Sequence, residues 1–391
     1  MQGHVRKRGA RWYFWVELER GPDGKRRQKS VGGFPTRRAA EDALEELRGE
    51  VRRGEYVERS PLTLTAFLTD EWLPARRAVI RATTWDHYRR IVEAYVVPTI
   101  GARPLSDLSP GHLNALYADL LQGGRRQLKR GSPAKPLSAR SVRHVHTMLH
   151  KARNDAVRWG HLARNPVDRA DPPKPATPEM NAWSPEQLRT FLAHVHGDRL
   201  YAAWLLLATT GMRRGELLGL RWSEIDLANK RLAVLRAHVL ANRQLVVSEP
   251  KSAKGRRTVA LDEVTVAALQ RHRLHQLEER LAAGEGWVDT GLLVTHLDGT
   301  AVDPRLFSSW FRRHARDAGL PHIQLHDVRH SYATAALAAG VPTKVVSERL
   351  GHASIAITLD TYSHVLPNMQ AEAAEQVARL ILGAAEVGNH L

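Results

Sequence analysis

Three short stretches in the second half of the chain carry side chains that could act together on a phosphate group. They are TGMRRGEL at residues 210–217, LHDVRH at 325–330, and LGH at 350–352 followed by Thr361 and Tyr362. Arginine presents a planar fork of N–H donors that matches phosphate oxygens. Tyrosine becomes a nucleophile once its proton is taken and nearby cations hold its negative charge. Together the stretches predict covalent chemistry on a phosphodiester.

The three stretches resemble the signature of tyrosine site-specific DNA recombinases of the phage-integrase type. The resemblance includes the spacing of three residues from His326 to Arg329 and of ten from His352 to Tyr362. It implies an enzyme that breaks and rejoins DNA strands through a 3′-phosphotyrosyl intermediate, and that integrates and excises a mobile genetic element. No ATP, metal or other cofactor is implied, and the sequence holds no GxxxxGK[ST] phosphate-binding loop.

The resemblance assigns catalytic roles to six residues, which are Arg213, Lys251, His326, Arg329, His352 and Tyr362. The two arginines would clamp the phosphate, and the tyrosine oxygen would attack it. His326 would handle a proton and orient the phosphate, while His352 would donate a hydrogen bond to a non-bridging oxygen. Lys251 would protonate the departing 5′ oxygen from an expected β-hairpin, in which Lys254 is the alternative general acid.

Other residues in the same stretches have competing interpretations. Arg214 could replace its neighbour as the phosphate ligand, although its place in the motif favours a surface or supporting position. His326 and His330 are four residues apart and would share one helical face, as in some metal sites. No glutamate adjoins the first histidine and the chain has no cysteine, so we expect no metal and a structural role for His330. We expect Glu216 and Asp327 to orient arginines or cap helices.

The composition favours a polyanionic partner. The chain has 391 residues with 58 Lys and Arg against 41 Asp and Glu, a formal charge of +17, which favours double-stranded DNA. Twelve of the basic residues lie between residues 121 and 170, and we expect several of them to contact phosphates: Arg140, Arg143, Lys151, Arg153 and Arg158. The absence of a long apolar run and of a signal peptide predicts no membrane partner and a cytoplasmic protein, nucleoid-associated when bound to DNA.

The patterning predicts a multidomain, mainly α-helical protein with small β elements. An aromatic-rich alternation at residues 11–18, a turn at 21–24 and a second alternation through Val31 indicate a hairpin. Thr36 can cap a following helix. We therefore expect an N-terminal domain at residues 1–58, with a small sheet and one helix, which the resemblance identifies with arm-type DNA binding.

The remainder divides at a proline-rich linker. Helical periodicity predicts a helical domain at residues 62–170, which resembles a core-binding domain, with helices at 65–73, 83–97, 109–121 and 139–159. Four prolines within residues 172–178 indicate a linker at 171–182. An α+β catalytic domain would follow at 183–391. Its first helix would begin at Ser184, and it would contain a strand-rich insert near 231–261.

The last helical pattern, residues 369–382, is amphipathic and could pack on its own domain or on a neighbouring protomer. The resemblance implies a homotetramer on core DNA sites, with arm-type sites bound by the N-terminal domain. An excisionase or a host DNA-bending protein is a further partner that the resemblance allows. Two rival functions are a type IB topoisomerase, disfavoured by the His352 motif and the terminal helix, and a DNA-binding regulator without catalysis.

Overall fold

A computed structural model describes residues 3–18, 27–52, 61–123, 135–176, 181–249, 255–362 and 369–382. Contacts divide the chain into two compact units, Met1–Thr177 and Pro178–Leu391. Helices dominate both units and the sheets are small and antiparallel, as the sequence predicts. Among the residues described, no helix is both long and apolar enough to cross a membrane.

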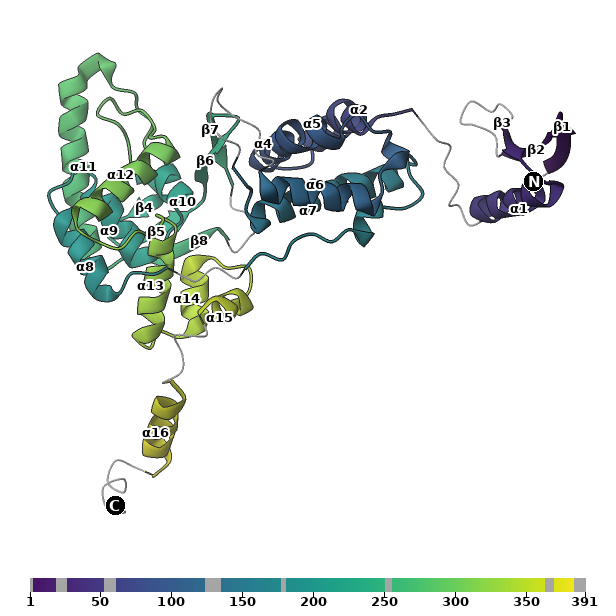
Figure 1. Ribbon diagram of the computed structural model, residues 1–391. Helices are drawn as coiled ribbons and strands as arrows, with labels where there is room; N and C mark the ends of the chain where they lie inside the picture. The colour runs from purple at the N-terminus through teal and green to yellow at the C-terminus, as the bar shows by residue number, and fades with distance from the viewer. Residues whose placement is uncertain are drawn as a thin grey trace. The chain divides into compact units, whose positions relative to one another are not determined.

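The first unit begins with a three-stranded antiparallel sheet backed by one helix (Figure 1). Its elements are β1 (Gly3–Arg8), β2 (Arg11–Leu18), β3 (Arg27–Phe34) and α1 (Arg37–Arg52). Phe14 and Val16 of β2 pack against Leu44 of α1, and the Thr36 side chain caps the helix by accepting from the Ala39 backbone N–H at 3.2 Å. The β2–β3 pairing confirms the predicted hairpin, although its turn lies outside the described residues. Strand β1 was not predicted, because most of its side chains are exposed and polar.

The rest of the first unit is helical. Its elements are α2 (Leu64–Ala66), η1 (Phe67–Trp72), α3 (Leu73–Arg77), α4 (Ala82–Ile91), η2 (Val92–Val96), α5 (Val97–Ile100), η3 (Leu105–Asp107), α6 (Pro110–Gln122), α7 (Ala139–Arg158) and η4 (Pro166–Arg169). The four predicted helices are present. The first two contain π-helical turns, η1 and η2, each followed by a segment with proline at its second position, Pro74 or Pro98. A proline ring clashes with the carbonyl one turn earlier, which a widened turn relieves.

Two basic residues of α7 are engaged within the protein. Arg153 is 2% exposed, and its Nη1 donates to the Leu105 carbonyl at 2.6 Å. The prediction that Arg153 contacts DNA phosphate is therefore wrong, because its guanidinium is held in the core of this unit. Arg158 pairs with Asp155 at 2.9 Å. The path of the backbone determines whether a basic side chain lies inside or outside the helical bundle. A count of charges along the sequence does not show which of the two is the case.

Asp155 is a buried anion that joins α7 to the first helical segment. It accepts from the Trp72 indole N–H at 2.8 Å and pairs with Arg76, which is also buried. Asp155→Asn should lower the free energy of unfolding of this unit by about 3 kcal/mol, because it leaves the Arg76 charge buried without a counter-ion. Native-state hydrogen exchange of the α7 amides in the full chain measures this loss.

The matched control for this substitution is Asp168→Asn, which breaks the exposed Asp168–His150 pair and should cost less than about 1 kcal/mol. Equal protection of α7 in both variants would contradict the prediction.

The second unit is built around one buried helix. Its helical elements are α8 (Pro185–His194), α9 (Tyr201–Thr210), α10 (Arg214–Gly219), η5 (Trp222–Glu224), α11 (Glu263–Ala283), η7 (Gly284–Gly286), α12 (Pro304–Asp317), α13 (Asp327–Ala338), α14 (Thr343–Leu350), α15 (Ile355–Tyr362) and α16 (Met369–Leu382). Helix α9 contacts α8, α10, α11 and α13 (Figure 1). It is buried nearly all round, so its sequence is apolar without a polar face.

Two small sheets complete this unit. The strands are β4 (Ile225–Asp226), β5 (Arg231–Val234), β6 (Ala237–Ala241), β7 (Gln244–Ser248) and β8 (Arg257–Ala260). They form the antiparallel sheets β4-β5-β8 and β6-β7. The predicted cap of α8 is present, since the Ser184 backbone N–H donates to Gln187 Oε1 at 2.9 Å and Gln187 N–H donates to Ser184 Oγ at 3.2 Å. Residues 171–176 form neither helix nor strand, as the prolines predict, and 177–180 lie outside the described residues.

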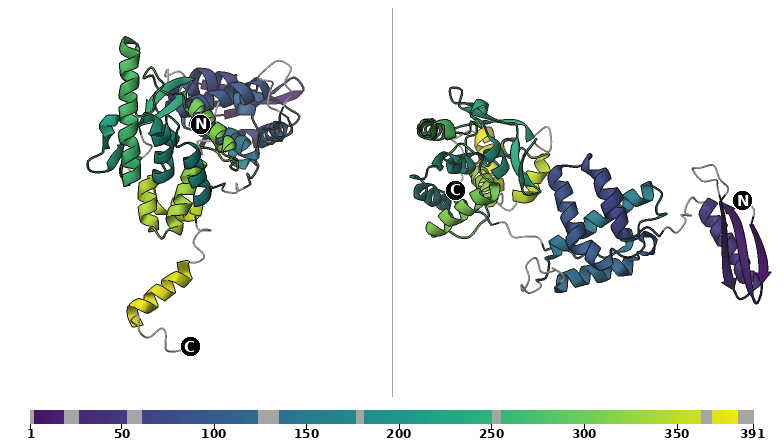
Figure 2. Two further views of the ribbon diagram at one scale, coloured as in Figure 1. Left: turned by 90° about the vertical axis from the view of Figure 1, so that its left-hand side faces the viewer. Right: turned by 90° about the horizontal axis from the view of Figure 1, so that it is seen from above.

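Helices α13, α14 and α15 gather at one end of the second unit (Figure 2). Gly211 ends α9 with a φ of 63°, in the left-handed region that favours glycine. A Cβ at this position would stand 2.5 Å from the Tyr332 ring of α13 and 2.7 Å from the Leu350 side chain of α14. The glycine therefore lets the end of α9 approach these two helices closely, and it brings the 210–217 stretch to the other two.

Candidate active site

Arg329 lies at the centre of this junction. It is 3% exposed on α13, with Nη1 donating to the Gly211 carbonyl at 2.9 Å and Nη2 donating to the Leu350 carbonyl at 2.6 Å. The carbonyls end α9 and α14, where the helix dipoles are negative. Burial, and next the charge of Arg213, lower the pKa of Arg329 to about 9. The guanidinium is therefore still a cation at neutral pH.

Arg213 precedes α10 and reaches the surface. Its Nη1 donates to Glu216 Oε1 at 2.8 Å, and its backbone N–H donates to Glu216 Oε2 at 3.0 Å. The arginine side chain is 40% exposed, whereas the glutamate side chain is 5% exposed. Arg213 is the N-cap residue of α10, and its guanidinium is held at the edge of the Arg329 junction.

Glu216 holds a second arginine that sequence reasoning did not single out. The side chain of Arg257 on β8 is 6% exposed, and its Nη2 donates to Glu216 Oε2 at 2.8 Å while its Nε donates to the Arg349 carbonyl at 2.6 Å. Burial raises the pKa of Glu216, but the hydrogen bond and charge of Arg257 and the charge of Arg213 outweigh it, so the net pKa is lowered. The prediction that Glu216 orients arginines is confirmed. Asp327 also caps locally, accepting from the Gln324 backbone N–H at 2.7 Å.

A pocket of about 340 Å³ opens beside Arg213. Arg213, Arg214, Ser308, Gln324 and His326 are among the residues that line it. Arg214 donates to Ser308 Oγ at 2.7 Å, so its guanidinium is already engaged on α12. Burial lowers the pKa of His326 to about 4, and the next contributions come from His330, Arg329 and Arg213. The ring is therefore neutral at neutral pH and shares the pocket wall with Arg213.

His352 follows the end of α14 and lies close enough to the same cations to be affected by their charge. Its Nδ1 lies 2.8 Å from the Thr358 hydroxyl. Burial lowers its pKa to about 4, followed by the charges of Arg329, Arg213 and Arg257. These electrostatic neighbours place His352 with the two arginines from the other stretches.

Tyr362 ends α15 and is 1% exposed. Its hydroxyl oxygen lies 2.7 Å from Nδ1 of His330 on α13. Burial raises the pKa of Tyr362 to about 12, while the charge of Arg329 lowers it. His330 thus contacts the expected nucleophile directly, a contact that sequence reasoning missed. The only signal in the sequence was that His330 lies four residues after His326. This spacing does not predict a contact with Tyr362, which lies 32 residues further along the chain.

Lys251 and Lys254 lie outside the described residues, so the structure does not place them. Strand β7 pairs with β6, and β8 pairs with β5. The strands that flank residues 250–254 therefore belong to different sheets, and the expected hairpin around the two lysines falls on residues outside the described ranges and stays a prediction. Five of the six predicted site residues lie in one neighbourhood: Arg213, His326, Arg329, His352 and Tyr362.

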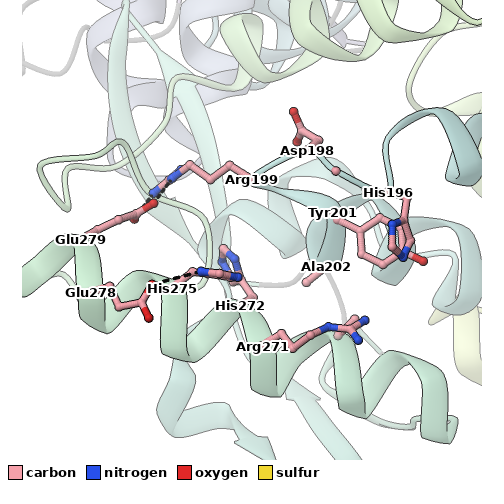
Figure 3. Close-up of a pocket in the computed structure, with 12 residues that line it drawn as sticks. His196, Asp198, Arg199, Tyr201, Ala202, Arg271, His272, His275, Glu278 and Glu279 are labelled. Carbon is pink, nitrogen blue, oxygen red and sulfur yellow. Dashed lines mark hydrogen bonds and ion pairs between the residues drawn. The ribbon is translucent and has the colours of Figure 1, made fainter.

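A larger cavity of about 750 Å³ lies elsewhere, beside the start of α9 and along α11 (Figure 3). Its wall includes Arg199, which pairs with Glu279 at 2.6 Å, and His275, which pairs with Glu278 at 3.2 Å. None of the five predicted site residues that the structure describes lines it. Within the described residues, no group of three His, Cys, Asp or Glu could hold a metal ion.

The comparisons with known proteins decide the family. Residues 182–369 match the phage integrase family, and residues 4–51 match an arm DNA-binding domain. The tyrosine recombinase XerC-like protein of Caldanaerobacter subterraneus subsp. tengcongensis is 30% identical over 96% of this chain and 98% of its own length. The chain belongs to the tyrosine recombinase family. Enzymes of this family cleave and rejoin DNA strands.

Two solved structures share the fold of this tyrosine recombinase. The Tn1549 transposon integrase in complex with transposon right-end DNA has a TM-score of 0.65 and 21% identity, covering 81% of this chain and 99% of that one. A lambda integrase tetramer bound to a Holliday junction has a TM-score of 0.54 and 17% identity, covering 90% and 95%. The recombinase therefore has the integrase fold predicted from its sequence.

Proposed function

We propose that this recombinase is the integrase of a mobile genetic element and that Tyr362 forms the 3′-phosphotyrosyl bond. The observation that carries the proposal is the Arg329 junction, where Arg213 of the first stretch and His352 and Tyr362 of the third lie near Arg329 of the second. A phosphodiester gains negative charge on its oxygens in the transition state, and fixed cations stabilise that charge. The likeness to a transposon integrase supports the mobile element.

Each motif residue then has a role that its contacts support. Arg329 donates two N–H groups to the Gly211 and Leu350 carbonyls. Its guanidinium has further N–H groups that would donate to a phosphate. The guanidinium of Arg213, whose side chain is 40% exposed, would provide a second set of N–H donors for the phosphate. If Thr358 donates to Nδ1 of His352, the neutral ring carries its proton on Nε2, which can donate to a non-bridging oxygen. His326 would orient the phosphate from the pocket wall.

The chain's other parts would bind DNA and neighbouring protomers. We assign residues 1–58 to arm-type sites, 62–170 to core sites, 171–182 to a linker and 183–391 to catalysis. The matched arm DNA-binding domain and the basic composition support the assignment.

On α16, Val377 is 53%, Leu380 87% and Ile381 73% exposed, which supports docking on another protomer in a tetramer such as that of lambda integrase. An excisionase or a host bending protein would set direction, and the protein would act on DNA in the cytoplasm.

A nicked suicide substrate tests this function. Once Tyr362 attacks next to the nick, the short leaving fragment diffuses away and the covalent complex accumulates. We expect the purified full chain to form this adduct in EDTA and without ATP. A DNA-binding regulator would retard the DNA in a mobility-shift assay but form no adduct. An adduct that requires a divalent metal would contradict the proposal. Strand exchange between two sites, measured in the same preparation, separates a recombinase from a topoisomerase that only relaxes DNA.

The general acid can be assigned with a substrate whose leaving oxygen is replaced by sulfur. Lys251→Ala should slow cleavage of ordinary DNA by about 10²–10⁴-fold. It should cleave the 5′-phosphorothiolate substrate at nearly the wild-type rate, because a thiolate departs without a proton. The matched control is Lys254→Ala, which should cleave both substrates normally. If sulfur rescues the second variant and not the first, Lys254 is the acid.

A further inference from the structure

The hydroxyl of Tyr362 is enclosed by protein. With 1% of the side chain exposed, bulk water has little access to the phenol proton. In the described part of the chain, the hydrogen-bond partner of this hydroxyl is Nδ1 of His330, at 2.7 Å. The two rings lie 5.7 Å apart between centroids. The proton that must leave before the oxygen can attack therefore faces a nitrogen that can accept it.

His326, which is the N-cap residue of α13, and His330 within α13 face different parts of the site. His326 lines the pocket beside Arg213, whereas His330 contacts Tyr362. Their rings stand edge to face, 5.3 Å apart between centroids. The motif histidine is thus placed to meet the phosphate, and the histidine four residues later is placed to meet the nucleophile.

The surroundings keep His330 neutral at neutral pH. Burial lowers its pKa, with Asp327 raising it and Arg329 lowering it by smaller amounts. A neutral imidazole protonated on Nε2 has a lone pair on Nδ1. The charge of Arg329 acts on both His330 and Tyr362, so the acceptor lies near the cation that stabilises the phenolate.

We propose that His330 is a catalytic residue, the general base that takes the Tyr362 proton during cleavage, an inference that rests on the proposed function. The O–H bond of the tyrosine breaks and its proton moves to Nδ1, while the tyrosine oxygen bonds to phosphorus. The bond from phosphorus to the 5′ oxygen breaks, and that oxygen receives a proton from the lysine general acid. During rejoining the imidazolium returns the proton to the departing tyrosine oxygen, as microscopic reversibility requires.

The test compares His330→Asn with the wild-type chain in single-turnover cleavage of the nicked substrate. An asparagine amide can still hydrogen-bond the hydroxyl but cannot take its proton, so we expect a rate loss of about 10²–10⁴-fold with unchanged DNA affinity. Placing difluorotyrosine at position 362, whose phenol ionises more readily, should restore most of the rate in the variant. The control is His314→Asn on α12, a half-buried histidine paired with Asp198, which should cleave normally.

The outcomes distinguish failure of this inference from failure of the proposed integrase function on which it rests. If the wild-type chain forms no adduct, the proposed function fails and the inference fails with it. If the wild-type chain forms the adduct and His330→Asn forms it equally fast, only the inference is overturned. A slow variant that difluorotyrosine does not rescue also overturns it, because the ring would then only position the tyrosine.

Discussion

Tyr362→Phe should form no covalent adduct with the nicked substrate while binding the same DNA with an affinity within about twofold of wild type. The reason is chemical, because phenylalanine keeps the ring that packs at the end of α15 but has no oxygen to bond to phosphorus. The loss of the contact with His330 should cost only about 1 kcal/mol of stability. Denaturing electrophoresis of the trapped complex measures the adduct, and a mobility shift measures the affinity.

Tyr201→Phe is the matched control for this substitution. Tyr201 begins α9 and lies beside His196, with ring centroids 5.0 Å apart and the ring planes tilted by 60°, and it lines the larger cavity. This variant should form adduct at the wild-type rate. An adduct that persists in Tyr362→Phe would show that another residue is the nucleophile, and mass spectrometry of the DNA-linked peptide would identify it.

Arg329→Lys should reduce the cleavage rate by about 10²–10³-fold, comparable to the loss of one transition-state donor in other enzymes. Lysine retains the positive charge, but a single ammonium group lacks the planar fork. It cannot bond the Gly211 and Leu350 carbonyls as the guanidinium does and also hold a phosphate in two places. Single-turnover cleavage at saturating protein concentration measures the chemical step apart from binding.

Arg312→Lys, an exposed arginine on α12, controls for the general effect of exchanging these residues and should cleave at the wild-type rate. Thermal unfolding of Arg329→Lys, measured in parallel, shows whether the junction remains folded at the assay temperature. A folded variant that cleaves within about threefold of wild type would contradict a phosphate-binding role for Arg329.

Local signals in the sequence predicted much of the secondary structure. The boundaries of the helices at 109–121, 139–159 and 369–382 agree with α6, α7 and α16 within a few residues, because capping residues and helical periodicity act over neighbouring positions. Strand β1 was missed because its pairing partner, and not its own composition, makes it a strand. The burial of Arg153 was missed because a basic residue is buried only where the surrounding elements offer it a partner.

The sequence alone determined the family, the integrase fold and which residues are candidates for catalysis. The spacing of motif residues within one stretch can be recognised without knowing how the chain folds. Tertiary structure decided how those stretches meet. The close approach at Gly211, the pairing of Arg257 with Glu216, and the contact of His330 with Tyr362 join residues far apart in the chain. Contacts of this kind depend on how α9, α13, α14 and α15 pack, and packing is a property of the folded chain as a whole.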